Sequence, residues 1–159
     1  MKNYEEGDQV RNFALPVDGG KTLDTSRDIN APYLVYFYPK DDTPGCTLEA
    51  IDFSNSSPFF KKNNIKIIGI SKDNIEKHDK FKKKHNLKVI LASDIEGKVC
   101  EDFGVWVEKS MYGKKYMGIE RSTFLIDEKH IIKKIWRKVK VKEHVSQVID
   151  EINTIFLKS

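Results

Sequence analysis

One cysteine of this chain lies where a helix is predicted to begin. Thr43 is a natural N-cap and Pro44 suits the first helical position, so Cys46 falls in the first turn. Free backbone N–H groups and the positive end of the helix dipole stabilise a thiolate at that place. The segment also follows a predicted central strand, where the ligand crevices of open α/β sheets form. Cys46 is therefore a candidate nucleophile, although free cysteines also serve as small buried hydrophobic residues.

The strands that must position Cys46 follow from the apolar patterning. Short continuous apolar runs predict central strands covered on both faces, at residues 33–38, 65–70 and 89–91. Residues 10–17 and 21–23 flank Gly19-Gly20, which predicts an N-terminal β-hairpin. A late β-hairpin is predicted from residues 120–126 and 131–141, around a turn at 127–129.

Helices are predicted between these strands. One begins near Thr43, a short one opens with the N-cap Ser57 and Pro58, and a polar one covers residues 74–85. An amphipathic helix over residues 143–157 closes the chain. Strand–helix–strand crossovers give parallel strands and the late hairpin adds antiparallel ones, so we expect an α/β, thioredoxin-like fold with a mixed central sheet between helices. We expect a single domain over residues 1–159.

Composition limits the compartment and the kind of partner. The chain has 159 residues, two cysteines and no apolar run as long as the ~18 residues of a membrane span. The first ten residues contain acids where a signal peptide needs an apolar stretch. We therefore expect a cytosolic protein with reduced cysteines and no membrane partner.

A basic segment from Lys133 to Lys142 offers a different hypothesis. Six of its ten residues are basic, and Trp136 could stack on a base, which is compatible with a nucleic-acid surface. The alternation of lysine and valine over residues 138–142 instead predicts a strand with one solvated side. The sequence pI of 8.9 lies below the value of ~9 typical of a nucleic-acid-binding domain. We expect no nucleic-acid partner and keep a non-catalytic binding protein as the alternative function.

The residues around Cys46 also resemble a known family. Pro39, Thr43 and Cys46 have the spacing of the peroxiredoxin motif Pro-x-x-x-Thr-x-x-Cys. The longer string YFYPKDDTPGCTLEA, residues 36–50, is similar to the Q-type branch, also called bacterioferritin comigratory proteins. The resemblance continues through residues 93–94, 97–98, 103–106, 121–127 and 136–139, and so covers nearly the whole chain.

The resemblance implies a thiol peroxidase that reduces hydrogen peroxide or organic hydroperoxides. Cys46 would be the thiolate that attacks peroxide and becomes a sulfenic acid. Thr43 would hold thiolate and peroxide in line, and Pro39 would limit access of water to the sulfur. Arg121 would stabilise the thiolate and the developing alkoxide, although its strand position alone equally suits a surface ion pair. Glu49 would orient that arginine, or is a carboxylate on the helix surface.

The sequence departs from the family at the second cysteine. Many Q-type members carry a resolving cysteine five residues after the reactive one, where this chain has Ile51, and others carry it on a later helix, where residues 74–85 contain none. Cys100 is the remaining thiol, and it is either a buried core residue or a resolving cysteine. The resemblance therefore implies an external reductant, namely thioredoxin, glutathione or a glutaredoxin, with no metal and no organic cofactor. We expect a monomer and leave a dimer open.

A cysteine hydrolase is the other enzymatic reading of Cys46. It would need a histidine bonded to the sulfur as general base. His78, His85, His130 and His144 are scattered along the chain, and we expect them to be solvated. The chain has no CxxC pair, which excludes a dithiol oxidoreductase on the same fold.

Overall fold

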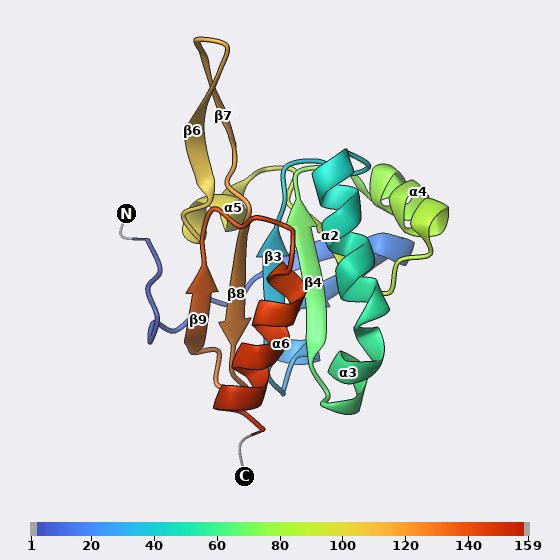
Figure 1. Ribbon diagram of the computed structural model, residues 1–159, viewed down its shortest axis with the longest axis vertical. Coiled ribbons are helices and arrows are strands. Elements are labelled where there is room, and N and C mark those ends of the chain that lie inside the picture. Colours follow the sequence, from blue (N-terminus) through green and yellow to red (C-terminus); the bar gives the residue numbers. More distant parts are fainter. Residues whose placement is uncertain (1–2, 158–159) are drawn as a thin grey trace.

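A seven-stranded mixed sheet forms the centre of the molecule in the computed structural model, which describes residues 3–157 (Figure 1). Its strand order is β2-β1-β5-β4-β3-β8-β9, and β3, β4 and β5 run parallel to one another. The remaining pairs of neighbours are antiparallel. The strands are β1 (Ala14–Val17), β2 (Lys21–Asp24), β3 (Tyr33–Phe37), β4 (Lys66–Ser71), β5 (Ile90–Ser93), β8 (Ser122–Ile126) and β9 (Ile132–Trp136).

Strand β3 is central because every one of its residues is apolar and buried. Its side chains alternate between the two faces of the sheet, as the pleat requires. Tyr33, Val35 and Phe37 belong to one hydrophobic cluster, whereas Leu34 and Tyr36, with the following Tyr38, belong to the other. Two separate cores therefore lie on opposite faces of one sheet.

The helices cover these faces unequally. The face of Tyr36 packs against α2 (Pro44–Asn55), α3 (Ser57–Lys62), α4 (Ile75–His85) and α6 (His144–Ile155). The face of Phe37 packs against the N-terminal segment and α5 (Lys98–Asp102), while the one-turn α1 (Thr25–Asp28) follows β2. The predicted thioredoxin-like arrangement, with its mixed sheet and its N-terminal hairpin, is confirmed. Among residues 3–157, no helix has the length and apolar character that a bilayer crossing requires.

The second strand of the late hairpin is shorter than the sequence predicts. Strand β9 ends at Trp136, and the predicted strand over residues 138–142 is wrong. The backbone N–H of Val139 donates to the carbonyl of Arg121 at 2.9 Å instead, and Lys138 has a left-handed φ of 48°. The extended ladder therefore breaks directly after Trp136.

A further hairpin was not predicted. Strands β6 (Trp106–Met111) and β7 (Lys114–Ile119) pair with each other and project from the body of the molecule (Figure 1). The short helix α3 also begins differently, because Ser56 is its N-cap and Ser57 its first residue.

Candidate active site

Cys46 lies in the first turn of α2, as the sequence predicts. Thr43 is the N-cap with an extended backbone, and Pro44 is the first helical residue. The carbonyl of Thr43 accepts the first helical hydrogen bond, from Thr47 at 2.8 Å. The side chain of Cys46 is buried within the core on the α2 face, with 2% of the residue exposed. The sulfur therefore lies at the positive end of a helix and largely out of water.

Arg121 joins two groups of this site. Its Nη2 donates to the sulfur of Cys46 at 3.4 Å, and its Nη1 donates to Oε1 of Glu49 at 2.6 Å. Only 17% of the Arg121 side chain is exposed, so the reading as a surface ion pair is wrong. Gly45 leaves room for the guanidinium, because a Cβ at that position would lie 3.2 Å from Nη2. A permanent positive charge is thus fixed beside the cysteine.

Glu49 lies beneath the arginine and not on the helix surface. The residue is fully buried, and burial raises the pKa of its carboxyl to about 7, against the opposing effect of the positive charge of Arg121. Oε2 of Glu49 has no hydrogen-bond partner among the described residues. The Oε1 bond fixes one nitrogen of the guanidinium, which leaves the other aimed at Cys46.

Thr43 and Pro39 precede the cysteine on the loop after β3. The Thr43 hydroxyl donates to the carbonyl of Lys40 at 2.9 Å, so its hydrogen is already used. The oxygen can still accept a hydrogen bond from a hydroperoxide. Pro39 is exposed at the start of the same loop. The structure therefore brings Arg121 into direct contact with both Cys46 and Glu49, and places Thr43 and Pro39 on the adjoining loop.

Cys100 lies on the opposite face of the sheet from Cys46. It belongs to the cluster beneath α5, whereas Cys46 belongs to the cluster beneath α2. Both thiols are free and buried. Burial, with the nearby Asp94 carboxylate, raises the pKa of the Cys100 thiol well above its usual value. Its thiolate is therefore disfavoured where Cys100 packs.

The expectation of solvated histidines is wrong, because two of the four are buried and the half-buried His85 and His130 are hydrogen-bonded to Asp42 and Tyr33. His78 and His144 are buried, with 0% and 2% exposed. Nε2 of His144 lies 2.8 Å from the hydroxyl of Thr123, and burial, with the positive charge of Arg121, lowers the pKa of His144 to about 4. Among the residues that the structure describes, no histidine forms a hydrogen bond to Cys46, which gives the cysteine-hydrolase reading no general base.

The burial of His78 has a weak signal in the sequence. It lies three residues before Phe81 on α4, so both side chains share the inward face of that helix. Oδ2 of Asp41 lies 2.6 Å from Nδ1 of this histidine. The burial of Asp41 has no signal in the sequence, because the residue lies on the loop between Pro39 and Thr43, next to the exposed Asp42.

Trp136 within the basic segment has a packing role. Its ring meets the ring of His144 edge-on, with the centroids 5.7 Å apart. The residue is half-buried at the end of β9.

Comparison with known proteins adds an independent finding. Residues 7–135 match the model of the AhpC/TSA family. The chain is 50% identical to peroxiredoxin Bcp of Bacillus subtilis, over 93% of this chain and 94% of that protein. It is 39% identical to peroxiredoxin Bcp of Escherichia coli, over 94% and 96%.

Solved structures agree with the sequence comparison. A cysteine-to-serine mutant of PrxQ from Xylella fastidiosa has a TM-score of 0.91 at 35% identity, over 97% of this chain and 98% of that one. The bacterioferritin comigratory protein of Xanthomonas campestris, described with alkyl peroxide reduction activity, has a TM-score of 0.85 at 39% identity. That match covers 89% of this chain and 90% of the other.

Proposed function

The chain belongs to the AhpC/TSA family as a peroxiredoxin of the Bcp or Q type, and from that premise we propose that it reduces hydroperoxides through Cys46. One observation supports this assignment most strongly. Arg121, itself fixed by the buried Glu49, donates to the sulfur of Cys46 at the N-terminus of α2. This arrangement stabilises negative charge on sulfur before substrate arrives and on oxygen as the reaction proceeds.

The first chemical step oxidises the sulfur. The Cys46 thiolate attacks the terminal oxygen of the hydroperoxide, so a sulfur–oxygen bond forms as the oxygen–oxygen bond breaks. Cysteine becomes a sulfenic acid, and the other peroxide oxygen leaves as hydroxide or alkoxide, which takes a proton to give water or alcohol. The guanidinium of Arg121 stabilises the charge that moves to the leaving oxygen.

Thr43 and Pro39 complete this proposal. The Thr43 hydroxyl donates its hydrogen to the carbonyl of Lys40, so its oxygen is the group that accepts a hydrogen bond from the hydroperoxide. This bond aligns the peroxide with the sulfur. Pro39 shields the approach to Cys46 from water, at the exposed start of the loop.

An external thiol returns Cys46 to its reduced form. A first thiol attacks the sulfenic sulfur, water leaves, and a mixed disulfide remains. A second thiol then releases reduced Cys46 and takes the disulfide away. We assign this role to a dithiol protein of the thioredoxin class, with glutathione or a glutaredoxin as the other candidates. Two free cysteines fit a reducing compartment such as the cytosol.

Peroxide consumption with a thioredoxin-type reductant tests the proposal. The wild type should consume hydrogen peroxide and an organic hydroperoxide, and Cys46→Ser should lose both activities. Cys100→Ser is the matched control, because it makes the same change at the other thiol. Activity that survives Cys46→Ser would refute the assignment.

A further inference from the structure

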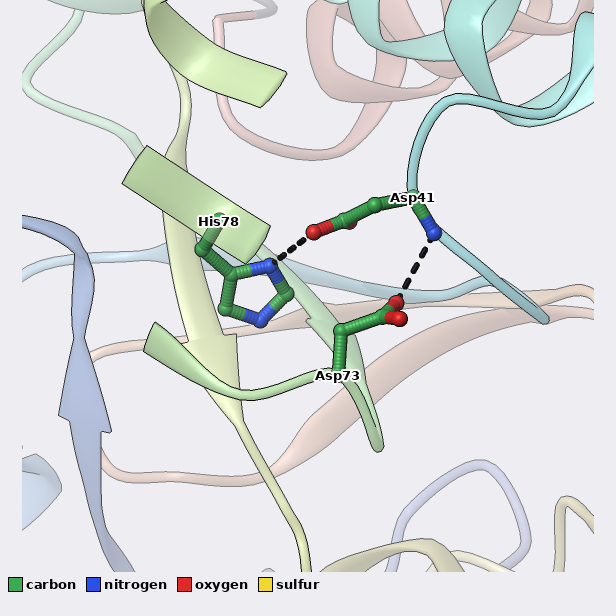
Figure 2. Close-up of side chains that lie close together, drawn as sticks. All are labelled: Asp41, Asp73 and His78. Atoms are coloured by element: carbon green, nitrogen blue, oxygen red, sulfur yellow. Dashed lines mark hydrogen bonds and ion pairs between the residues drawn. The ribbon is translucent and has the colours of Figure 1, made fainter. Parts of the chain in front are cut away.

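A buried polar cluster connects the loop before Cys46 with helix α4. Figure 2 shows Asp41 from that loop, Asp73 from the turn after β4, and His78 from α4. Asp41 and Asp73 are each 8% exposed, and His78 is 0% exposed. Oδ2 of Asp41 lies 2.6 Å from Nδ1 of His78, and the backbone N–H of Asp41 donates to Asp73 at 2.8 Å.

Hydrogen bonds engage both polar ends of the Asp41 and His78 side chains. Nε2 of His78 lies 3.0 Å from the carbonyl of Ala92, which can only accept, so Nε2 carries a hydrogen. The hydroxyl of Tyr38 donates to Oδ1 of Asp41 at 2.5 Å. One hydrogen lies between Oδ2 of Asp41 and Nδ1 of His78, so every polar side-chain atom of the two residues has a hydrogen-bond partner.

This arrangement does not suit a metal ion. Nε2 of His78 donates to the carbonyl of Ala92, and Nδ1 shares a hydrogen with Oδ2 of Asp41, so neither nitrogen is free for a metal. Oδ2 of Asp73 already accepts from Asp41 and from the hydroxyl of Ser71 at 2.6 Å. The cluster is internally satisfied, and its role must lie in what it holds in place.

What it holds is the segment that leads to the reactive cysteine. Asp41 lies two residues before the N-cap Thr43 and five before Cys46. The neighbouring carbonyl of Lys40 holds the Thr43 hydroxyl. On the outer side, Asp42 accepts from Lys84 at 2.7 Å and pairs with His85 at 2.9 Å, both on α4. The loop is thus fixed to α4 twice, once in the core and once at the surface.

The two attachments differ in strength. The Asp42 side chain is 42% exposed, and exposed ion pairs contribute little. The Asp41–His78 hydrogen bond is buried, and removal of one partner leaves a polar atom of the other unsatisfied in the core. The loop position therefore depends mainly on the buried pair.

We propose that Asp41 and His78 are positioning residues for the peroxide reaction, through which α4 fixes the Thr43 oxygen relative to the sulfur of Cys46. The proposal rests on the proposed peroxidase function. Neither side chain contacts the sulfur or the peroxide. Their effect passes through the backbone between Asp41 and Cys46, where a misplacement of about 1 Å can cost about 100-fold in rate.

The test compares two reactions of Cys46 in the same variants. The peroxide reaction needs the Thr43 oxygen in position beside the sulfur, whereas alkylation by iodoacetamide needs the thiolate that Arg121 stabilises and makes no use of Thr43. Asp41→Asn and His78→Gln should each lower the peroxide rate constant about 10- to 100-fold and change the alkylation rate less than about 3-fold. In the double variant two amides can hydrogen-bond to each other in place of both partners, and the peroxide rate constant should recover at least about 3-fold over the slower single variant.

Two further variants keep the test decisive. Asp42→Asn makes the same change at the exposed neighbour and should leave the peroxide rate constant within about 2-fold. Tyr38→Phe removes one hydrogen bond to Asp41 and leaves the Asp41–His78 hydrogen bond in place, so it tests the cluster even if the Asp41 and His78 variants fail to fold. It should slow only the peroxide reaction, by about 3-fold or more.

The outcomes separate the two proposals. Peroxide turnover that needs Cys46 confirms the function whatever the cluster variants do, and a wild type without turnover overturns both proposals. Given turnover, unchanged peroxide rates overturn the positioning role, as does a parallel change of peroxide and alkylation rates. A double variant with no recovery also overturns the assignment of Asp41 and His78 as one unit.

Discussion

Cys46 and Cys100 pack on opposite faces of the same β-sheet. Each belongs to a different hydrophobic cluster, and the side chains of β3 alternate between the two. A disulfide requires Cα atoms within about 7 Å and sulfurs in contact, so a bond between them would demand unfolding of α2 or α5. The structure thus favours the core role for Cys100 over the resolving role.

The first prediction concerns regeneration. After one equivalent of peroxide, Cys46 should persist as a sulfenic acid that dimedone traps, with little Cys46–Cys100 disulfide by non-reducing mass spectrometry. Cys100→Ala should retain turnover with an external thiol. Excess peroxide should inactivate the protein progressively, because a lingering sulfenic acid is open to oxidation to the sulfinic form. Rapid, near-quantitative Cys46–Cys100 disulfide, with loss of recycling in Cys100→Ala, would show that Cys100 resolves.

The second prediction concerns Arg121. Replacement by alanine removes the donor to sulfur and leaves the buried Glu49 without its cation, so the pKa of Glu49 should rise above about 7. The peroxide rate constant should fall about 10- to 1,000-fold. Arg121→Lys keeps the charge but cannot serve both partners as a planar fork, and should recover only part of the loss. Stopped-flow kinetics measure this, and wild-type rates in Arg121→Ala would remove the assigned role.

The third prediction tests the hydroxyl oxygen of Thr43 separately from the branched shape of the side chain. Thr43→Val keeps the branched side chain and removes the oxygen, whereas Thr43→Ser keeps the oxygen. The peroxide rate constant should fall about 10- to 1,000-fold in Thr43→Val and stay within about 5-fold in Thr43→Ser. Circular dichroism should be native in both. Equal rates in the two variants would mean that the oxygen plays no part.

The fourth prediction concerns acid stability. Burial lowers the pKa of His144 to about 4, below the usual value of 6.5. The unfolded chain therefore binds the extra proton first as the pH falls, and folding stability should decrease from pH 6.5 towards pH 4, by up to about 3 kcal/mol. His144→Gln can keep the bond to Thr123 and should lose less stability over that range. Urea unfolding at several pH values measures both, and parallel profiles would contradict the attribution.

Much of the sheet could be predicted because buried central strands are continuous apolar runs in the sequence. The all-apolar run at β3 and the Thr43-Pro44 start of α2 are local signals, and both locate Cys46. The β6–β7 hairpin gives no such pattern because, apart from its base, it lies outside the core, with Met111, Tyr112 and other residues in water. The Tyr112-Gly113 pair, which forms the turn with positive φ at both residues, was the sequence signal available for this hairpin.

The candidate site could be predicted in its parts but not in its contacts. Cys46 and Thr43 share one short segment, so their spacing alone relates them. Arg121 reaches them only because β8 lies beside β3, which is a consequence of the sheet order. The burial of Glu49 and of the Asp41–His78 pair likewise depends on packing between distant segments. The sequence shows which residues can carry a charge, and only the fold shows which of them are buried and paired.

The most direct measurement of the central claim follows a single turnover. One equivalent of hydrogen peroxide is added to reduced protein in the presence of dimedone, and intact-mass and peptide spectra locate the adduct. We expect one adduct per chain, on Cys46, with one peroxide consumed, and no adduct in Cys46→Ser. An adduct on Cys100, or peroxide consumption without modification of Cys46, would contradict it.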